Sequence, residues 1–327
     1  MNSIRDQRLS LSICIPTYNR VKSLENLMNI LLPQCAGSSV QIVVSNNCSS
    51  DDTDSFCRVL ESRESCFDYV CQKSNIGFSG NLRAAMELSR GDFIWMLGDD
   101  DIPSPGIVNK ILNLLDKDVG WIAGNFKKVD NESGREKVVF NFPDSNSGYD
   151  LEQCLNNLGI WASFMSISIV SSNVKKYFDS VPNNDFFGFS VALAAGMQGG
   201  WFLYDEVIVS RKVTPFREHR FDNADTYIFD FFSYIDYLVL EKKLSKRIRN
   251  KLANQMSFTI SRLCLQCKIN NKPLPRWSLI YAKHSKVRNF WLFVQPIYIL
   301  PAHLLRFFLR LVQHVASVFN IKKLKDL

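Results

Sequence analysis

The chain has 327 residues, of which 46% are hydrophobic and 12% are aromatic. This composition excludes a disordered polypeptide, and the length is sufficient for one large domain or two of ordinary size. The net charge of +7 is unevenly distributed, because residues 1–240 carry 21 basic and 30 acidic side chains whereas residues 241–327 carry 18 basic and 2 acidic ones. We therefore expect an anionic partner for the C-terminal region only.

The nine cysteines are scattered without the regular spacing of a disulfide framework, which indicates a reducing compartment. Cys264 and Cys267 form the one Cys-x-x-Cys pair, but no second ligand pair for zinc follows it, so apolar positions on a helix are the favoured interpretation. The apolar run at residues 9–15 is too short for a signal-peptide core. We expect a cytoplasmic protein.

The first 125 residues alternate between strand-like and helix-like patterns. The predicted strands are Leu11–Ile15, Gln41–Ser45, Phe67–Gln72 and Phe93–Leu97. The first predicted helix has Leu24, Leu27, Met28 and Leu31 on its inner face, and the second covers Thr53–Ser62 with Asp51 and Asp52 as N-cap candidates. The third covers Ser79–Ser89 with Leu82, Ala85 and Leu88 inside. The fourth starts at Ser104–Pro105 with Ile107, Ile111, Leu114 and Leu115 inside. Repeated strand–helix units predict a doubly wound α/β sheet with helices on both faces.

Residues 119–211 mix short strands with helices and contain no linker-like stretch. The expected strands are Val138–Phe142, Ser166–Val170 and Trp201–Tyr204, and the expected helices are Leu151–Leu158 and Ser190–Gly196. We therefore predict one domain over residues 1–224, with halves at about 1–118 and 119–224. A helical, basic region over residues 225–327 follows it.

Polar segments follow the predicted strands at the edge where doubly wound sheets bind ligands. They are Pro16–Arg20, Ser45–Asp52, Asn75–Asn81 and Gly98–Asp101. The last segment contains three consecutive carboxylates, Asp99, Asp100 and Asp101, whose mutual repulsion calls for a cation. Mn²⁺ or Mg²⁺, held by one or two of these carboxylates and by diphosphate oxygens, fits that need. The alternative is a turn that caps the helix at Pro105.

Four motifs together resemble the family-2 glycosyltransferases of GT-A fold: SICIPTYNR at residues 12–20, VVSNNCSSDDT at 43–53, NIGFSGN at 75–81 and RGDFIWMLGDDD at 90–101. They occur in the order and spacing of that family over about the first 105 residues. Within it, the LGDDD version is similar to O-antigen sugar transferases of the abequosyltransferase type. The resemblance implies a GT-A, Rossmann-like mixed sheet and an inverting transfer of sugar from a nucleotide-sugar donor to a saccharide acceptor, which we expect to be lipid-linked through polyprenyl diphosphate.

The resemblance also implies site residues. Those expected at the nucleotide sugar are Pro16, Thr17, Tyr18, Asn19, Arg20, Asn46, Asn47, Asn75, Gly77, Asn81, Arg83 and Asp99, and those expected at the metal are Asp99, Asp100 and Asp101. Asn46 stands where the family usually has an aspartate that reads the base or ribose. Gly98 takes the first aspartate position of the metal motif and Asp100 the second, which implies weaker metal dependence. Asp51 is expected to be structural or a helix cap.

The family's catalytic base is an acidic residue before a helix with small residues, which points to Asp185. The alternative is that Asp185 caps that helix. Asp144, Asp205 and Asp222 are weaker candidates because they lack this context. Trp161 is expected to be a core residue rather than a sugar-stacking one.

The C-terminal region combines apolar and basic stretches. Phe290–Leu305 is too short to span a bilayer and contains Pro296 and Pro301. From His303 to Asn320 polar residues recur every three or four positions, which predicts an amphipathic helix. Its basic neighbours are Lys242, Lys243, Lys246, Arg247, Arg249, Lys251, Lys322, Lys323 and Lys325. We expect peripheral attachment to the anionic inner face of the cell membrane.

Three alternatives stay open. The basic region could bind nucleic acid, although no recognition motif accompanies it and the rest of the chain is acidic, so we expect no nucleic-acid partner. The region could instead be an ordinary packing or oligomerisation element. The whole chain could be a catalytically silent GT-A domain that binds carbohydrate or acts as a scaffold.

Overall fold

The computed structural model describes residues 9–115, 119–130, 133–142, 147–213, 224–269, 274, 276, 280–281 and 284–305. The chain divides into two compact units, residues 1–215 and 216–327. We describe each unit by itself. The predicted domain boundary, between residues 224 and 225, follows a segment, 214–223, that lies outside the described residues.

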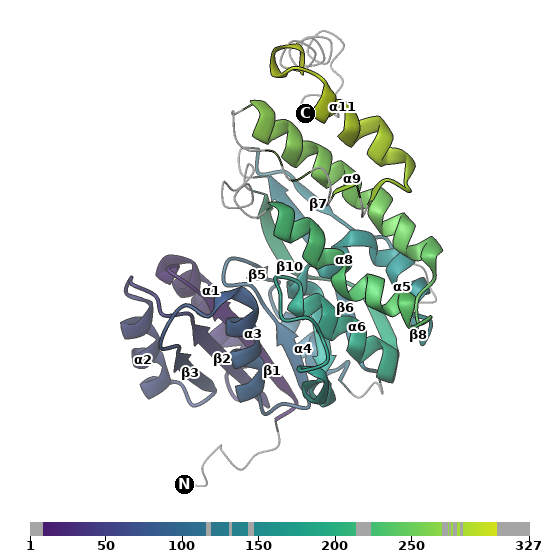
Figure 1. Ribbon diagram of the computed structural model, residues 1–327. Helices are drawn as coiled ribbons and strands as arrows, with labels where there is room; N and C mark the ends of the chain where they lie inside the picture. Colours follow the sequence, from purple (N-terminus) through teal and green to yellow (C-terminus); the bar gives the residue numbers. More distant parts are fainter. Residues whose placement is uncertain are drawn as a thin grey trace. The chain divides into compact units, whose positions relative to one another are not determined.

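A single mixed sheet organises the first unit (Figure 1). Its strands, in the order in which they lie side by side, are β3 (Phe67–Cys71), β2 (Val40–Asn46), β1 (Leu11–Thr17), β4 (Phe93–Met96), β9 (Ser168–Ser171), β6 (Trp121–Asp130), β10 (Trp201–Val213) and β5 (Ile102–Pro103), with β7 (Glu136–Val138) paired to β6 and β8 (Ser147–Gly148) paired to β10. The first four strands are mutually parallel, whereas β9 runs antiparallel to both β4 and β6. The predicted mixed α/β sheet is confirmed.

The order of β3, β2, β1 and β4 reverses direction at β1. The chain moves outward from β1 to β3 through α1 (Val21–Cys35) and α2 (Thr53–Arg63), and then crosses back to β4 through α3 (Gly77–Leu88). Because such crossovers are right-handed, α3 covers the face opposite to α1 and α2. The ends of β1 and β4 therefore form a switch point, where loops diverge and leave room for a ligand.

Helix α6 (Phe187–Gly199) contacts α3 and packs over β6 and β9. Figure 1 shows α3 and α6 on the same side of the sheet. Gly188 near the start of α6 permits this approach, because a Cβ there would lie 3.1 Å from Leu82 Cδ2 and 3.2 Å from Met96 Sδ. The sheet core includes three fully buried tryptophans, Trp95, Trp121 and Trp201. Their indole N–H groups donate to the Ser166 carbonyl, the Ser168 hydroxyl and the Asp150 carbonyl, which removes the cost of burying an unpaired donor.

The predicted elements of the first unit are confirmed with some displaced ends. Helix α5 (Leu151–Leu158) has the predicted bounds, and Asp150 caps it by accepting from Glu152 N. The predicted strand at 138–142 is instead β7, and the one at 166–170 begins at Ser168 because Met165–Ile167 forms a 3₁₀ turn.

Two details of the predicted helices were wrong. Leu88 is exposed, and Met86 replaces it on the buried face of α3 beside Leu82 and Ala85. Helix α4 (Ile107–Leu112) starts after Gly106 instead of at Pro105. Gly106 has a φ of 69°, a left-handed conformation that a right-handed helix cannot include.

The second unit is helical in its described part. Helix α8 (Ala224–Leu240) packs on α9 (Lys246–Ile269), and the π-helical turn η5 (Phe290–Val294) and α11 (Gln295–Ile299) also pack on α9. Cys264 and Cys267 are buried on α9 and form no disulfide, which confirms the apolar-position interpretation. Arg249 of the predicted basic cluster forms an ion pair with Asp236 at 2.9 Å and stacks over Phe232. Residues 306–327, and with them most of the predicted amphipathic helix, lie outside the described residues.

No helix within the described residues is both long enough and apolar enough to cross a bilayer. Helix α11 ends at Ile299, and Pro301 lies two residues beyond that end.

Candidate active site

The candidate site begins at the switch point, where the loop after β1 meets the loop after β4. Pro16 and Thr17 are the last residues of β1 and are buried, whereas Tyr18 and Asn19 are exposed beyond the strand end. Thr17 Oγ1 donates to Asp99 Oδ2 at 2.8 Å, so the two loops are joined by a buried hydrogen bond.

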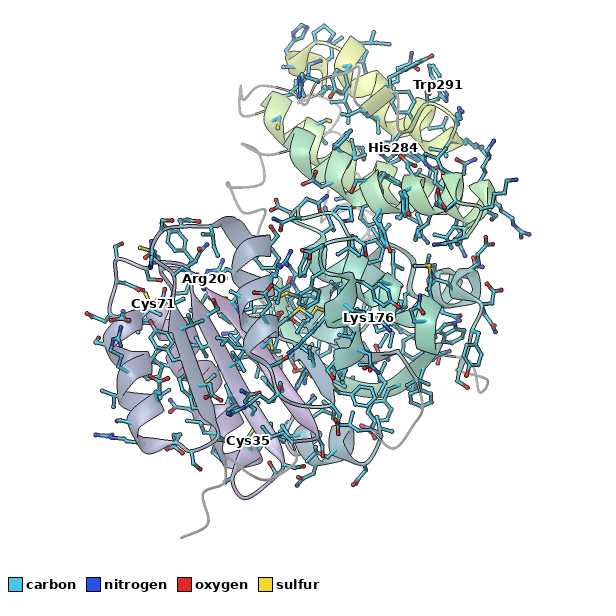
Figure 2. All side chains as sticks on the ribbon, turned by 60° about the horizontal axis from the view of Figure 1, so that its bottom comes forward. Arg20, Cys35, Cys71, Lys176, His284 and Trp291 are labelled. Carbon is cyan, nitrogen blue, oxygen red and sulfur yellow. The ribbon has the colours of Figure 1, made fainter. Side chains whose placement is uncertain are left out.

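Arg20 provides the cation that the acid triplet needs. Its Nη1 lies 2.8 Å from Asp99 Oδ1 and 3.3 Å from Asp100 Oδ2 (Arg20 is labelled in Figure 2). Burial raises the pKa of Asp99, although Arg20 and the Thr17 hydroxyl offset part of this effect. Burial acts to lower the pKa of Arg20, but the neighbouring Asp99 and Asp100 carboxylates outweigh it and raise the pKa. The site therefore holds a partly neutralised cluster of charge.

Asp101 has a different hydrogen-bond partner from Asp99. Its Oδ2 accepts a 2.5 Å hydrogen bond from the Ser166 hydroxyl, and that hydroxyl accepts from Gly98 N at 2.9 Å. Burial raises the pKa of Asp101 to about 7, against the lowering effects of Ser166 and Arg211. A Cβ on Gly98 would lie 2.7 Å from Asp101 Oδ2. The Asp101 carboxylate thus occupies the space that a side chain at position 98 would need.

The predicted three-carboxylate metal site is not assembled. In the described part of the chain no group of three or more His, Cys, Asp or Glu side chains is arranged to hold a metal ion. Asp99 oxygens accept from Arg20 and Thr17, and Asp101 accepts from Ser166. The Asp100 side chain is 31% exposed. Asp100 is thus the member of the triplet whose carboxylate is partly open to solvent, and carboxylate oxygens are hard ligands of the kind that Mg²⁺ and Mn²⁺ prefer.

Asn46 and Asn47, at the end of β2, hold neighbouring loops in place. Asn46 is fully buried; its Oδ1 accepts from Ser49 N and its Nδ2 donates to the Tyr69 hydroxyl. Asn47 Nδ2 donates to Asn75 Oδ1 and its Oδ1 accepts from Ile76 N. Both carboxamides are therefore engaged with the protein itself, and neither carries the carboxylate that the family usually places at position 46.

Asn75, Gly77 and Asn81 shape the loop that leads into α3. Asn75 Oδ1 accepts from Gly77 N at 2.9 Å, and Gly77 has a φ of 78°, which favours glycine. Asn81 is buried and donates from Nδ2 to the carbonyls of Thr17 and Ser45. One side chain thus joins the ends of β1 and β2.

Asn19 and Asp51 join the loops after β1 and β2 on their exposed side. Asn19 adopts a φ of 51°, which asparagine tolerates, and its Oδ1 accepts from Ser50 N at 2.7 Å. Asp51 accepts from Val21 N, at the start of α1, and from Thr53 N and Oγ1, at the start of α2. Asp51 therefore caps two helices, as the structural prediction for this residue implies, whereas Asp52 makes no side-chain cap bond.

Arg83 is placed differently from the predicted diphosphate contact. It forms ion pairs with Glu87 at 2.8 Å and with Asp179 at 2.7 Å, and its guanidinium lies 5.7 Å from the Phe178 ring centroid. These ion pairs occupy Nε and Nη2 of the Arg83 guanidinium.

Asp185 lies two residues before the start of α6. Its side chain is exposed and forms no hydrogen bond, while Asn184 Oδ1 accepts from Phe186 N instead. Asp185 therefore does not cap α6. Three residues further on, α6 runs so close to the end of β4 that a Cβ on Gly188 would lie 3.2 Å from Met96 Sδ. Of the weaker base candidates, Asp205 accepts from Asn125, and Asp144 and Asp222 lie outside the described residues.

Two groups of side chains at the site were not predicted from the sequence. Ile76, just before α3, and Phe78, in the first turn of α3, are 44% and 42% exposed and, like the predicted Tyr18, present apolar surface at the sheet edge. Arg211 on β10 stacks over the Phe164 ring at 4.7 Å, and its charge acts on Asp101. The pairing of Ser210 with Ile102 brings Arg211 beside Asp101. The sequence alone does not connect Arg211 with Asp101, because 110 positions separate the two residues and only the fold brings them together.

Trp161 is half-buried instead of a full core residue. Its ring lies 5.5 Å from that of Phe126, and Lys128 Nζ lies 3.7 Å from its centroid. The aromatic rings of Phe126, Trp161 and Phe164, with Lys128 and Arg211 beside them, lie in the second half of the unit, from β6 onward.

Two curated proteins share part of this chain. Abequosyltransferase RfbV of Salmonella typhimurium is 34% identical over 94 residues, which is 28% of each chain. The GalNAc(5)-diNAcBac-PP-undecaprenol beta-1,3-glucosyltransferase of Campylobacter jejuni is 28% identical over 116 residues, 35% of this chain and 37% of that protein. The matched stretches thus span less than half the length of either relative.

Solved structures share the fold over a longer span. Residues 1–349 of S. aureus TarS have a TM-score of 0.52 and 16% identity, with 88% of this chain and 91% of that chain covered. The mannosyltransferase PcManGT of Pyrobaculum calidifontis has a TM-score of 0.50 and 16% identity over 71% of this chain and 65% of that chain. These likenesses confirm the GT-A fold. Residues 12–171 match the family model "Glycosyl transferase family 2". This segment of the chain, with β1, β4 and the loops that follow them, is therefore a family 2 glycosyltransferase domain.

Proposed function

We propose that the chain transfers a sugar from a nucleotide-sugar donor to a hydroxyl of a saccharide acceptor, with inversion, in surface polysaccharide synthesis. The observation that carries the proposal is the meeting of Arg20, Asp99 and Asp100 at the switch point between β1 and β4. Both the charges and the location suit a diphosphate. The family 2 domain and the relatives that transfer abequose and glucose support the reaction class.

The donor nucleotide is proposed to lie against the loops after β1, β2 and β3. Tyr18, Ile76 and Phe78 offer exposed apolar faces for a nucleobase, and Asn46, Asn47 and Asn81 keep the loops at fixed separation. In support, the TarS structure was solved with UDP-GlcNAc and with UDP, and that of PcManGT with GDP-Man and Mn²⁺.

Asp100 would hold a divalent ion, which supplies positive charge to the departing diphosphate. Arg20 keeps the acid triplet from repelling that anion, because it already offsets the charges of Asp99 and Asp100. Asp185 is proposed to take the proton of the acceptor hydroxyl. Its exposed, unbonded carboxylate suits a general base, and α6 approaches the end of β4 through Gly188.

The acceptor is proposed to be an oligosaccharide linked to polyprenyl diphosphate at the inner face of the cell membrane. The Campylobacter relative is named for an undecaprenol-linked substrate. The exposed basic side chains of the second unit, among them Lys242, Lys243, Lys246 and Arg247, suit an anionic bilayer.

A thermal-shift panel of nucleoside diphosphates, with and without Mn²⁺, tests the donor site. We expect one base to raise the melting temperature most, more strongly with Mn²⁺, and Asp100→Ala to lose the Mn²⁺-dependent part. Glu87→Ala on the exposed end of α3 is the matched control and should keep both responses. An unchanged melting temperature with every nucleotide would contradict the proposal. Nucleotide binding without turnover of any donor would favour the silent-domain alternative.

A further inference from the structure

The segment 290–299 is apolar on both its inner and its outer side. Phe290, Val294 and Ile297 are buried against α9, as expected for a packing element. Trp291, Leu292, Phe293 and Ile299 are also apolar, yet they are 43%, 51%, 40% and 68% exposed. We call these four residues the apolar patch. A helix that only covers a core has polar residues on its outer face, so ordinary packing does not account for them.

The patch is held in place by contacts within the second unit. The Trp291 indole donates to the Ser285 carbonyl at 2.8 Å, and its ring lies edge-on to Tyr281 and Phe290. On the inner side, Lys268 Nζ donates to the carbonyls of Ile297 and Tyr298 and so fixes the end of α11 to α9. Figure 2 labels Trp291 on this segment. The aromatic and aliphatic side chains are therefore displayed from a supported backbone.

Exposed basic residues border the patch. Lys286 and Arg288 are exposed immediately before it, and residues 241–327 as a whole carry 18 basic and 2 acidic side chains. Apolar side chains with a tryptophan, next to cations, match the interface of a bilayer with anionic headgroups. A second protein copy suits this surface less well, because like charges would face one another.

We infer that the apolar patch inserts into the headgroup boundary of an anionic phospholipid bilayer while Lys286 and Arg288 contact the headgroups. The inference rests on the proposed function, since a lipid-linked acceptor requires the enzyme at a membrane. It assigns insertion to residues 291–299, upstream of the amphipathic sequence beyond His303.

Cosedimentation of the full chain with vesicles tests this assignment. The vesicles contain phosphatidylglycerol and phosphatidylcholine in equal parts, or phosphatidylcholine alone. Removing one inserted Leu or Trp side chain corresponds to a loss of about tenfold in affinity. We therefore expect Leu292→Ser and Trp291→Ser each to weaken binding about tenfold. Leu240→Ser, at a position that is 80% exposed at the end of α8, is the control and should change binding less than about twofold.

The charge contribution is tested with Lys286→Gln/Arg288→Gln, which should weaken binding to the anionic vesicles but not to phosphatidylcholine. Unchanged vesicle affinity of Leu292→Ser overturns the inference. A lower melting temperature of that variant with vesicle binding retained also overturns it, because the chain itself would then cover the patch. A dimer in sedimentation velocity that Leu292→Ser dissociates overturns it as well, because a second copy would then cover the patch. Nucleoside-diphosphate binding is measured separately without lipid, so a failure of the proposed function leaves the vesicle result interpretable.

Discussion

Arg20 Nη1 lies 2.8 Å from Asp99 Oδ1, and this ion pair links the loop after β1 to the loop after β4. The Asp99 side chain is 6% exposed and that of Arg20 is 37% exposed, so the carboxylate is buried while the cation reaches solvent. An unpaired carboxylate at that depth would be costly. The pair therefore makes a charged, ligand-facing strand end compatible with a stable sheet.

Arg20→Met should destabilise the first unit by about 1–3 kcal/mol, because Asp99 would remain buried without its cation. This range is lower than the cost of breaking a fully buried ion pair, because the Arg20 guanidinium is partly exposed and solvent screens its charge. Urea denaturation measures the change. Arg58→Met, which removes an exposed pair with Asp54, should cost less.

Arg20→Met/Asp99→Asn provides the internal check on this prediction. With the buried charge removed, the double variant should recover part of the stability that Arg20→Met loses. A double variant that is less stable than the sum of both single changes would show that Asp99 is not the group that Arg20 compensates.

The sheet around this pair was predictable because its strands are short apolar runs with polar residues at their carboxyl ends. Leu11–Ile15 and Phe93–Leu97 each lie within one residue or two of β1 and β4. The strand order, and with it the switch point, follows from crossover handedness. Helix ends were harder: the left-handed Gly106 delays α4, and the buried face of α3 uses Met86 because helical rotation turns Leu88 outward.

Gly98→Ala should destabilise the first unit by about 1–3 kcal/mol, because the new Cβ would crowd Asp101 Oδ2 at 2.7 Å. In Gly98→Ala/Asp101→Ala that oxygen is absent and the nearest remaining atom is Ser166 Oγ at 3.3 Å. The double variant should therefore cost less than the sum of the two single changes. Strict additivity in thermal or urea unfolding would mean that the two positions do not compete for space.

The stability of the first unit should fall as the pH rises from about 4 to 7 in the presence of a chelator. Burial raises the pKa of Asp101 from its ordinary value of 3.8 to about 7, so in this interval the native state keeps a proton that the unfolded chain releases. Asp101→Asn removes the titrating group and should flatten this part of the profile. If stability falls with pH as steeply in Asp101→Asn as in the unchanged protein, the effect belongs to other carboxyls. Asp99 is the nearest of these with a raised pKa.

Asp51→Ala should cost about 1–2 kcal/mol, because the carboxylate accepts from the first backbone N–H groups of both α1 and α2. Asp52→Ala is a matched control one position away, since Asp52 makes no side-chain cap bond. Its effect should stay within about 0.5 kcal/mol. Equal losses in urea denaturation would contradict the cap assignment.

The candidate site was less predictable than the sheet, because its partners come from distant parts of the chain. The sequence motifs identified Asp99–Asp101, but the division of their hydrogen bonds between Arg20, Thr17 and Ser166 depends on loops that only the fold brings together. Arg83 illustrates the converse. Its position near the donor segment suggested a diphosphate contact, yet the fold places it beside Asp179, 96 residues away.

Turnover of a nucleotide sugar by Asp185→Asn is the decisive measurement for the proposed sugar transfer. The donor identified by thermal shift is incubated with Mn²⁺ and a saccharide acceptor, and the released nucleoside diphosphate is quantified. We expect Asp185→Asn to bind the donor as the unchanged protein does, with transfer reduced about 100-fold or more by loss of the base. Asp179→Asn, which changes another exposed aspartate, is the control and should retain activity. Unchanged transfer by Asp185→Asn would contradict the assignment of this base, and no transfer by the unchanged protein with any donor that binds would contradict the proposed activity itself.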